Sequence, residues 1–312
     1  MKINYVTQPT ELSILLERHR RKPAVYETAK LAFLGVDGYD VYNISSEFTW
    51  KDKRYIAGRV ERRDSEISHV RFFEKIDLAC YRLTSGGIEL FQDPCVTVID
   101  GALFVGGTQI HPGHDRHIVA WNTAFYAGPG LTTLVKVAAA PAKMKDVRVE
   151  RMGDLHVFTR PQGGSAGAGT IGYYRTHDLT GVNPTAIEQA PLLFTQFPPG
   201  CWGGVNQILP LDNGLLGIVG HIATMSEGDV RHYYGMSFVF DPITRQSTEV
   251  EILCERRDFQ DGAAKRPDLV DVVFLGGLVR HDNGTATLFT GLSDAEAHSA
   301  IIDDPFLKYE RE

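Results

Sequence analysis

Residues 91–108 carry the strongest folding signal of the sequence, because a two-residue turn there separates two short apolar runs. Val96 and Val98 alternate with a polar residue, and a second short apolar run follows at 103–105, as expected of two strands. Between them lies Asp100-Gly101, a dipeptide that strongly favours a tight hairpin turn. The stretch therefore predicts an antiparallel hairpin, and the fold must accommodate it.

The same hairpin pattern recurs along the chain, at 146–160, 205–221 and 271–291, with a less regular copy at 38–73. Each hairpin is followed by a third short apolar run, and the copies are spaced by roughly 50 to 70 residues. That period suits the blades of a β-propeller with long connections. The sequence therefore predicts an all-β fold, a five-bladed β-propeller with a short N-terminal helix at 9–22. A β-sandwich made of hairpin repeats is the alternative.

Length, charge and cysteine content limit the possible functions. The 312 residues suit a single domain, residues 1–312, in which residues 1–37 form the helix and the lead-in. A net charge of -7 and a pI near 5.9 argue against general binding of nucleic acid or anionic membranes. No apolar run could span a bilayer, and no secretory signal is visible. The four cysteines form no close pair, which fits a reducing compartment. We therefore expect a cytoplasmic protein.

Asp93 is the first candidate for catalysis, because Asp93-Pro94 opens the first strand of the hairpin. Proline fixes the backbone and donates no ladder hydrogen bond, so the carboxylate is held at the end of a sheet. A carboxylate in that place can act as an acid or a base. An Asx turn before a strand is the simpler interpretation of the same dipeptide.

A propeller would bring equivalent positions of its repeats together around a central channel. Carboxylates surrounded by cations there would suit an anionic or heavily hydroxylated ligand. The polar residues at matching positions of the repeats are Asn43, Arg59, Asp93, Arg160, His221 and Asp294.

This set resembles the site of the inverting β-mannoside phosphorylases, a glycoside-hydrolase family with a five-bladed propeller. Five segments carry the resemblance, in the family's order: Gln92-Asp93-Pro94-Cys95 with Asp100-Gly101, Arg160-Pro161, residues 214–221, residues 274–279 and residues 290–294. A closer similarity is to the mannosyltransferase/phosphorylases of mannogen turnover, mannogen being an intracellular β-1,2-mannan of protozoan parasites. Their signatures resemble residues 58–73 and 291–297.

The resemblance implies a reaction with one catalytic carboxylate, Asp93, acting as general acid through a sugar hydroxyl. Phosphate would attack the anomeric carbon of a β-mannoside from the opposite face and give α-mannose 1-phosphate. In the transferase direction Asp93 would act as base, with an α-linked donor such as GDP-mannose. The implied partners are mannose oligosaccharides, inorganic phosphate or mannose 1-phosphate, and GDP-mannose, and the resemblance implies no cofactor and no metal.

The resemblance also divides the site into two sides. It implies that the sugar is bound by Asn43, Arg59, Asp64, Asn206 and Asp294, and phosphate by Arg160, His221, Tyr233 and Tyr234. The sequence departs from the family's motif at Cys95, where the family has arginine, and at Gln92, where it has glutamate. The lost cation would weaken phosphate binding and favour the transferase reaction.

Two other functions stay open at this point. A hydrolase would need a second carboxylate about 6.5–9.5 Å from Asp93 to activate water, and Asp64 or Glu66 could supply it. A non-catalytic propeller that binds glycans or proteins would have an inert Asp93 and exposed apolar patches. Two motifs are interpreted as loops. The histidines at 111–117 suit a solvated loop over the channel rim better than a metal site, with contact to phosphate or a nucleotide as the alternative. The glycine-rich stretch 163–172 lacks a phosphate-loop ending and suits a flexible connection between strands, with a lid as the alternative.

Overall fold

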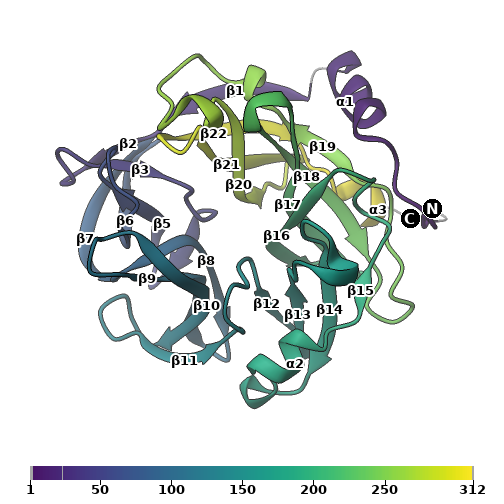
Figure 1. Cartoon of the computed structure of the whole chain (residues 1–312), viewed down its shortest axis with the longest axis horizontal. Coiled ribbons are helices and arrows are strands. Elements are labelled where there is room, and N and C mark those ends of the chain that lie inside the picture. The colour runs from purple at the N-terminus through teal and green to yellow at the C-terminus, as the bar shows by residue number, and fades with distance from the viewer. Residues whose placement is uncertain (1–2, 23, 311–312) are drawn as a thin grey trace.

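The chain forms mainly antiparallel β-strands, and its computed structural model describes residues 3–22 and 24–310. Consecutive strands pair into five mainly antiparallel groups that follow one another around a ring, and the parallel pairing of β2 with β7 is the exception within a group (Figure 1). The first group has the order β2-β7-β6-β5-β3, with β4 beside β5. Its strands are β2 (Ala32–Leu34), β3 (Asp40–Tyr42), β4 (Phe48–Trp50), β5 (Lys53–Glu61), β6 (Ser68–Asp77) and β7 (Cys80–Ile88).

The second and third groups are four-stranded sheets of sequential strands. They contain β8 (Phe91–Ile99), β9 (Ala102–Pro112), β10 (Ile118–Gly128) and β11 (Val135–Ala139), then β12 (Arg148–Met152), β13 (Asp154–Thr159), β14 (Ile171–Thr176) and β15 (Leu192–Leu193). The predicted hairpin is confirmed: Ile99 pairs with Ala102. Asp100 and Gly101 have φ values of 52° and 76°, the left-handed backbone that this tight turn requires.

The fourth and fifth groups share one sheet, because β18 and β20 pair in parallel at His232↔Asp271 and Tyr233↔Val272. Strand β1 comes from the N-terminal part of the chain and pairs with β22, so the fifth group joins both ends of the ring. The strands are β16 (Trp202–Pro210), β17 (Leu216–Met225), β18 (Arg231–Phe240) and β19 (Glu251–Cys254), then β20 (Asp271–Arg280), β21 (Thr285–Leu292), β22 (Glu296–Asp303) and β1 (Val25–Lys30).

Helices are short, and α1 and α2 lie at the outside of the ring (Figure 1). The helix expected at 9–22 is confirmed as α1 (Leu12–Arg21), whose last turn is basic. The others are α2 (Pro184–Glu188), α3 (Leu307–Glu310) and the 3-10 turns η1 (Gly164–Ala166), η2 (Leu179–Gly181), η3 (Glu227–Asp229), η4 (Arg256–Asp258) and η5 (Pro267–Leu269). Within the described residues, none of these helices has the length and apolar character needed to cross a membrane.

Five buried apolar clusters hold the ring together, one at each junction between neighbouring groups. At one junction Phe104 and Phe125 of the second group stack and pack against Val157 of the third. At another, Phe73 of the first group packs with Phe289 of the fifth, which closes the ring. Because every group buries apolar side chains on both sides, no single group has a complete core of its own.

One strand from each group lies toward the middle of the ring, namely β5, β8, β12, β16 and β20, and β8 contacts β5, β12 and β20 (Figure 1). Three of these inner strands have irregular register: β8 between Gln92 and Cys95, β16 between Val205 and Gln207, and β20 between Leu275 and Gly277. A bulge turns side chains out of the regular alternation of a strand. Polar side chains on the inner strands can therefore point into the middle of the ring instead of into the core.

Candidate functional site

Six residues that match across the repeats meet at one cavity of about 200 Å³ at the middle of the ring. They are the six expected from their equivalent positions: Asn43, Arg59, Asp93, Arg160, His221 and Asp294. The rest of the lining is Lys145, Asp146, Arg231, Tyr233, Arg266, Leu269, Val272 and Phe274. Segments from all five groups therefore contribute to a single polar site.

Asn43 links the two carboxylates of the cavity. Its Nδ2 donates to Oδ1 of Asp93 at 2.9 Å and to Oδ1 of Asp294 at 3.3 Å. Arg59 adds a contact from Nη1 to Oδ1 of Asp93 at 3.4 Å. Asp93 itself is 8% exposed. Burial, together with the charge of Asp93, raises the pKa of Asp294, although the guanidinium of Arg59 opposes that rise.

The backbone at the site is strained at four non-glycine residues. Asn43, Asp93, Asp146 and Asp294 have φ values of 43°, 51°, 57° and 50°. Residues other than glycine rarely adopt this left-handed region, and each instance costs about 1–3 kcal/mol unless the surroundings enforce it. Such strain collects at functional sites, where it fixes the direction of a side chain. Three of these four residues carry the carboxylates of the cavity.

A buried network holds Arg59 in place. Nε and Nη2 of Arg59 donate to Oε2 of Glu61 at 3.0 and 2.6 Å. The same carboxylate accepts from the hydroxyl of Tyr42 at 2.9 Å and forms an ion pair with Lys265. Glu61 is 1% exposed, so its charge depends on these partners. Arg59 is thereby fixed beside Asp93.

On the opposite side of the cavity, two arginines share one carboxylate. Nη1 of Arg160 lies 3.1 Å from Oδ2 of Asp146, and Nη2 of Arg148 lies 3.5 Å from its Oδ1. Burial would raise the pKa of Asp146, but the two guanidinium groups lower it overall. The backbone carbonyl of Gly203 also accepts from Nε of Arg160 at 3.0 Å. One positive charge therefore remains unbalanced among these three side chains, which suits an anion.

Gly204 allows this side of the site to pack so closely. A Cβ atom on Gly204 would lie 2.8 Å from Cδ of Arg160 and 3.4 Å from Cε1 of His221. His221 is buried, its Nδ1 lies 2.8 Å from Oδ1 of Asn206, and Tyr233 stacks on its ring with centroids 5.3 Å apart. Burial lowers the pKa of His221 to about 3. The imidazole is therefore neutral near pH 7, so the contact with phosphate that the resemblance implies for His221 would be a neutral hydrogen bond.

Three expected residues lie outside the cavity lining. Asn206 lies at the bulge of β16, behind His221, and its Oδ1 is within hydrogen-bond distance of the His221 ring. Tyr234 faces the apolar core while its neighbour Tyr233 faces the cavity, because successive strand residues point to opposite faces. Asp64 lies in a turn with its side chain 77% exposed, 3.4 Å from Arg62.

Five site residues were not expected from the sequence: Glu61, Lys145, Asp146, Arg231 and Arg266. Asp146 had a usable signal, because it stands before the alternating apolar residues of its repeat, as Asp93 does before residues 96–98. Arg231 begins β18, whereas Arg266 lies in the irregular connection from β19 to β20, where no periodicity indicates direction.

The two features interpreted as loops contribute no residue to the cavity lining. The histidines at 111, 114 and 117 are exposed around the β9–β10 turn. The glycine-rich stretch contains η1 and packs Gly169 near Arg160.

Outside the site, His19, Glu255 and Asp258 could together reach a metal ion. Arg20 already donates two hydrogen bonds to Glu255, at 2.8 and 2.7 Å, so this cluster is explained by ion pairing.

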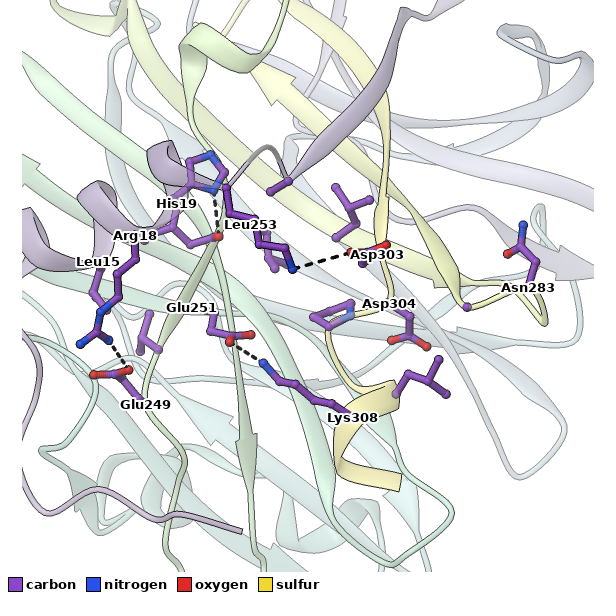
Figure 2. Close-up of a pocket in the computed structure, with 18 residues that line it drawn as sticks. Leu15, Arg18, His19, Glu249, Glu251, Leu253, Asn283, Asp303, Asp304 and Lys308 are labelled. Atoms are coloured by element: carbon purple, nitrogen blue, oxygen red, sulfur yellow. Dashed lines mark hydrogen bonds and ion pairs between the residues drawn. The ribbon is translucent and has the colours of Figure 1, made fainter. Parts of the chain in front are cut away.

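A larger cavity of about 650 Å³ lies at the outside of the ring, between α1, β19 and the end of β22 (Figure 2). Its charged side chains pair with one another: Arg18 with Glu249 at 2.6 Å, and Lys308 with Glu251. We place the functional site in the smaller central cavity, because strained carboxylates and unbalanced cations meet there.

The chain is similar over most of its length to several solved structures. The family described as "Protein of unknown function (DUF1861)" matches residues 17–308. No curated protein matches the sequence. The mannose phosphorylase MPT-4 from Leishmania mexicana, solved with a phosphate ion, is 33% identical with a TM-score of 0.89, and the match covers 96% of this chain and 95% of that chain.

Two further solved structures are similar. The GDP-Man-dependent mannosyltransferase MPT-1 from Leishmania mexicana is 28% identical with a TM-score of 0.87, covering 97% of this chain and 98% of that chain. The β-1,2-mannobiose phosphorylase from Listeria innocua is 15% identical with a TM-score of 0.61, covering 88% of this chain and 93% of that chain. This last likeness concerns the fold alone.

Proposed function

Because this chain belongs to the mannosyltransferase/phosphorylase family and matches the DUF1861 family over residues 17–308, we propose that it transfers mannose between a mannoside and phosphate. The reaction would be reversible, with inversion: a β-1,2-mannoside and phosphate give α-mannose 1-phosphate and a shortened mannoside. The observation that carries the proposal is the meeting of Asp93 with an unbalanced arginine, Arg160, in one small cavity.

Asp93 is proposed as the only catalytic carboxylate. In phosphorolysis its proton passes, directly or through a sugar hydroxyl, to the glycosidic oxygen as that oxygen leaves the anomeric carbon. A phosphate oxygen forms the new bond to the same carbon from the opposite face, so the β-linkage becomes an α-phosphate. In synthesis the same steps run backwards and Asp93 takes the proton, as microscopic reversibility requires.

The remaining roles follow the two sides of the cavity. We assign the sugar hydroxyls to Asn43, Arg59 and Asp294, with Asn206 supporting the site from below, and phosphate to Arg160, Lys145 and Tyr233. His221 acts as a neutral hydrogen-bonding group. Asp64 and Tyr234 take no part in this proposal, since they lie outside the cavity.

We also propose that the fold is a five-bladed propeller forming one domain, with each antiparallel group as a blade. Two observations support this interpretation: an apolar cluster lies at each junction between groups, and one strand of each group (β5, β8, β12, β16 and β20) lies toward the middle of the ring. The four free cysteines are consistent with the proposed cytoplasmic location, where thiols stay reduced.

GDP-mannose is the second candidate donor, favoured by the similarity to MPT-1 and by Cys95 in place of a cation. A hydrolase is less well supported. Of its two candidate carboxylates, Asp64 is exposed, and Glu66 is held by Arg266 at 2.8 Å and Lys265 at 3.1 Å. Neither carboxylate belongs to the lining of the central cavity.

Phosphate release tests the proposal. The protein is incubated with α-mannose 1-phosphate and short β-1,2-mannosides, beside Asp93→Asn and a control, Asp100→Asn, which changes an exposed carboxylate on the turn of the same hairpin. We expect chain extension with phosphate release in the wild type and in Asp100→Asn. Asp93→Asn should lose at least about 100-fold in rate, the usual contribution of acid–base catalysis.

The same assay separates the alternatives. Extension from GDP-mannose but not from mannose 1-phosphate would favour the transferase. Release of free mannose without phosphate would favour hydrolysis. Full activity of Asp93→Asn with either donor would rule out the proposed role of Asp93.

A further inference from the structure

Two arginines at the edge of the central cavity are joined by one carboxylate. Arg231 and Arg266 both line the cavity, one at the start of β18 and the other just before η5. Asp268, within η5, forms an ion pair with Nη1 of Arg231, and its Oδ1 lies 3.1 Å from Nε of Arg266. A second carboxylate, Glu66, lies 2.8 Å from Nη1 of Arg266.

The edge of the cavity therefore differs in charge balance from its phosphate side. On the phosphate side, Arg148 and Arg160 share the single carboxylate of Asp146. At the edge, two arginines face two carboxylates. Lys265 also reaches Glu66, at 3.1 Å, but it is paired with the buried Glu61 as well. The phosphate side therefore has one unbalanced positive charge that an anion can meet. At the edge of the cavity, the charges of Arg231 and Arg266 are already balanced by carboxylates of the protein.

A pair of guanidinium groups is a typical receptor for a phosphoryl group, because each offers a planar fork of donors. Asp268 stays charged here, since its hydrogen bond with Arg266 lowers its pKa. Its oxygens lie where the oxygens of a bound phosphoryl group would meet Arg231 and Arg266. A protein can exclude a ligand by placing a like charge at the position that the ligand needs.

We propose that Asp268 makes this site selective for a donor with a single phosphoryl group, by occupying the place where Arg231 and Arg266 would bind the second phosphoryl group of a nucleoside diphosphate sugar. The inference rests on the proposed mannose transfer and selects between its two donors.

Calorimetric binding of GDP and of inorganic phosphate tests this inference. The proteins compared are the wild type, Asp268→Asn and a matched control, Asp100→Asn, which removes a carboxylate paired with Arg151 on an outer turn. We expect Asp268→Asn to bind GDP about tenfold more tightly than the wild type, because two charged donors become available. Phosphate affinity should change by less than about threefold, and Asp100→Asn should match the wild type for both ligands.

A second variant shows which groups receive the ligand. Adding Arg231→Gln to Asp268→Asn should abolish the gain in GDP affinity. If Asp268→Asn does not fold, as judged by thermal unfolding, Asp268→Ala replaces it in both comparisons. GDP affinity that is unchanged or weaker without the carboxylate, or a gain that survives Arg231→Gln, would overturn the inference. Failure of the wild type to bind phosphate would instead count against the proposed function, so the two failures are distinguishable.

Discussion

His221 is a buried base between charged neighbours, and its environment makes the stability of the protein depend on pH. Burial, together with the charges of Arg160 and Arg148, lowers its pKa to about 3 against the opposing effect of Asp146. An unfolded histidine titrates near pH 6.5. Between about pH 3 and pH 6.5 the unfolded state therefore binds a proton that the folded state does not. The free energy of unfolding should fall as the pH is lowered through this window.

Replacing His221 should remove part of this dependence. We expect the free energy of unfolding of His221→Gln to fall less steeply than that of the wild type between pH 6.5 and pH 5, in urea titrations at fixed pH. His177, whose side chain is 93% exposed, supplies the control, and His177→Gln should keep the wild-type slope. Equal slopes for all three proteins would show that His221 is charged in the folded state.

Single residues also show what the sequence could predict of the site. Equivalent positions of a repeat converge, so Asn43, Asp93 and Asp294 could be grouped before any coordinates existed. Which of Tyr233 and Tyr234 points into the cavity depends on the register of β18, which the sequence alone does not fix. In the structure Tyr233 points into the cavity and Tyr234 into the core. Asp64 lies next to a motif that contributes to the site, but its turn carries the side chain into solvent.

At the scale of elements, helix α1 is attached to the ring by one narrow apolar face. Leu15 and Leu16 are buried in the cluster between the third and fourth groups, while Ile14 on the same helix is 42% exposed. Arg20 adds the bidentate contact to Glu255 beside β19. The helix is short, so its stability depends on this docking more than on intrinsic helix propensity.

Truncating a buried leucine of α1 should therefore cost more than truncating its exposed neighbour. We expect Leu16→Ala to lower the free energy of unfolding by about 2 kcal/mol, at the low end for buried leucines because the helix lies at the surface. Ile14→Ala should change it by less than about 0.5 kcal/mol. Urea unfolding at pH 7 measures both. Equal losses would mean that α1 is not docked through the face that buries Leu16.

The elements that the sequence predicted and those it did not differ in physical type. The hairpin at 91–108 combines a two-residue turn with a short apolar run on either side, and both signals are local. Strand β1 (Val25–Lys30) was not predicted, since its segment was expected to be only a lead-in. Its side chains are half-exposed or exposed, so its sequence shows only weak apolar alternation. The β19–β20 connection, with Arg266 and Asp268, is fixed by ion pairs to distant residues, which no local pattern reveals.

At the scale of the whole molecule, the ring is closed by its two chain ends. Strand β1 pairs with β22 over residues 25–30, so an N-terminal strand completes the last antiparallel group. The apolar cluster that contains Phe73 and Phe289 lies at the junction of the first and fifth groups. Each group packs against two neighbours, so opening this junction would expose apolar surface on both sides and loosen the inner strands that carry the site.

A covalent link across the closure should therefore stabilise the entire ring. Ala29 and Ser299 are directly opposite in the β1–β22 ladder, and opposite residues of antiparallel strands are close enough for a disulfide. We expect Ala29→Cys/Ser299→Cys, once oxidised, to gain about 2–4 kcal/mol in the free energy of unfolding, because the bond restricts nearly the whole unfolded chain. The same variant reduced with dithiothreitol is the control and should unfold like the wild type. Identical denaturant midpoints for the oxidised and reduced forms would show that the ring does not open at β1 when it unfolds.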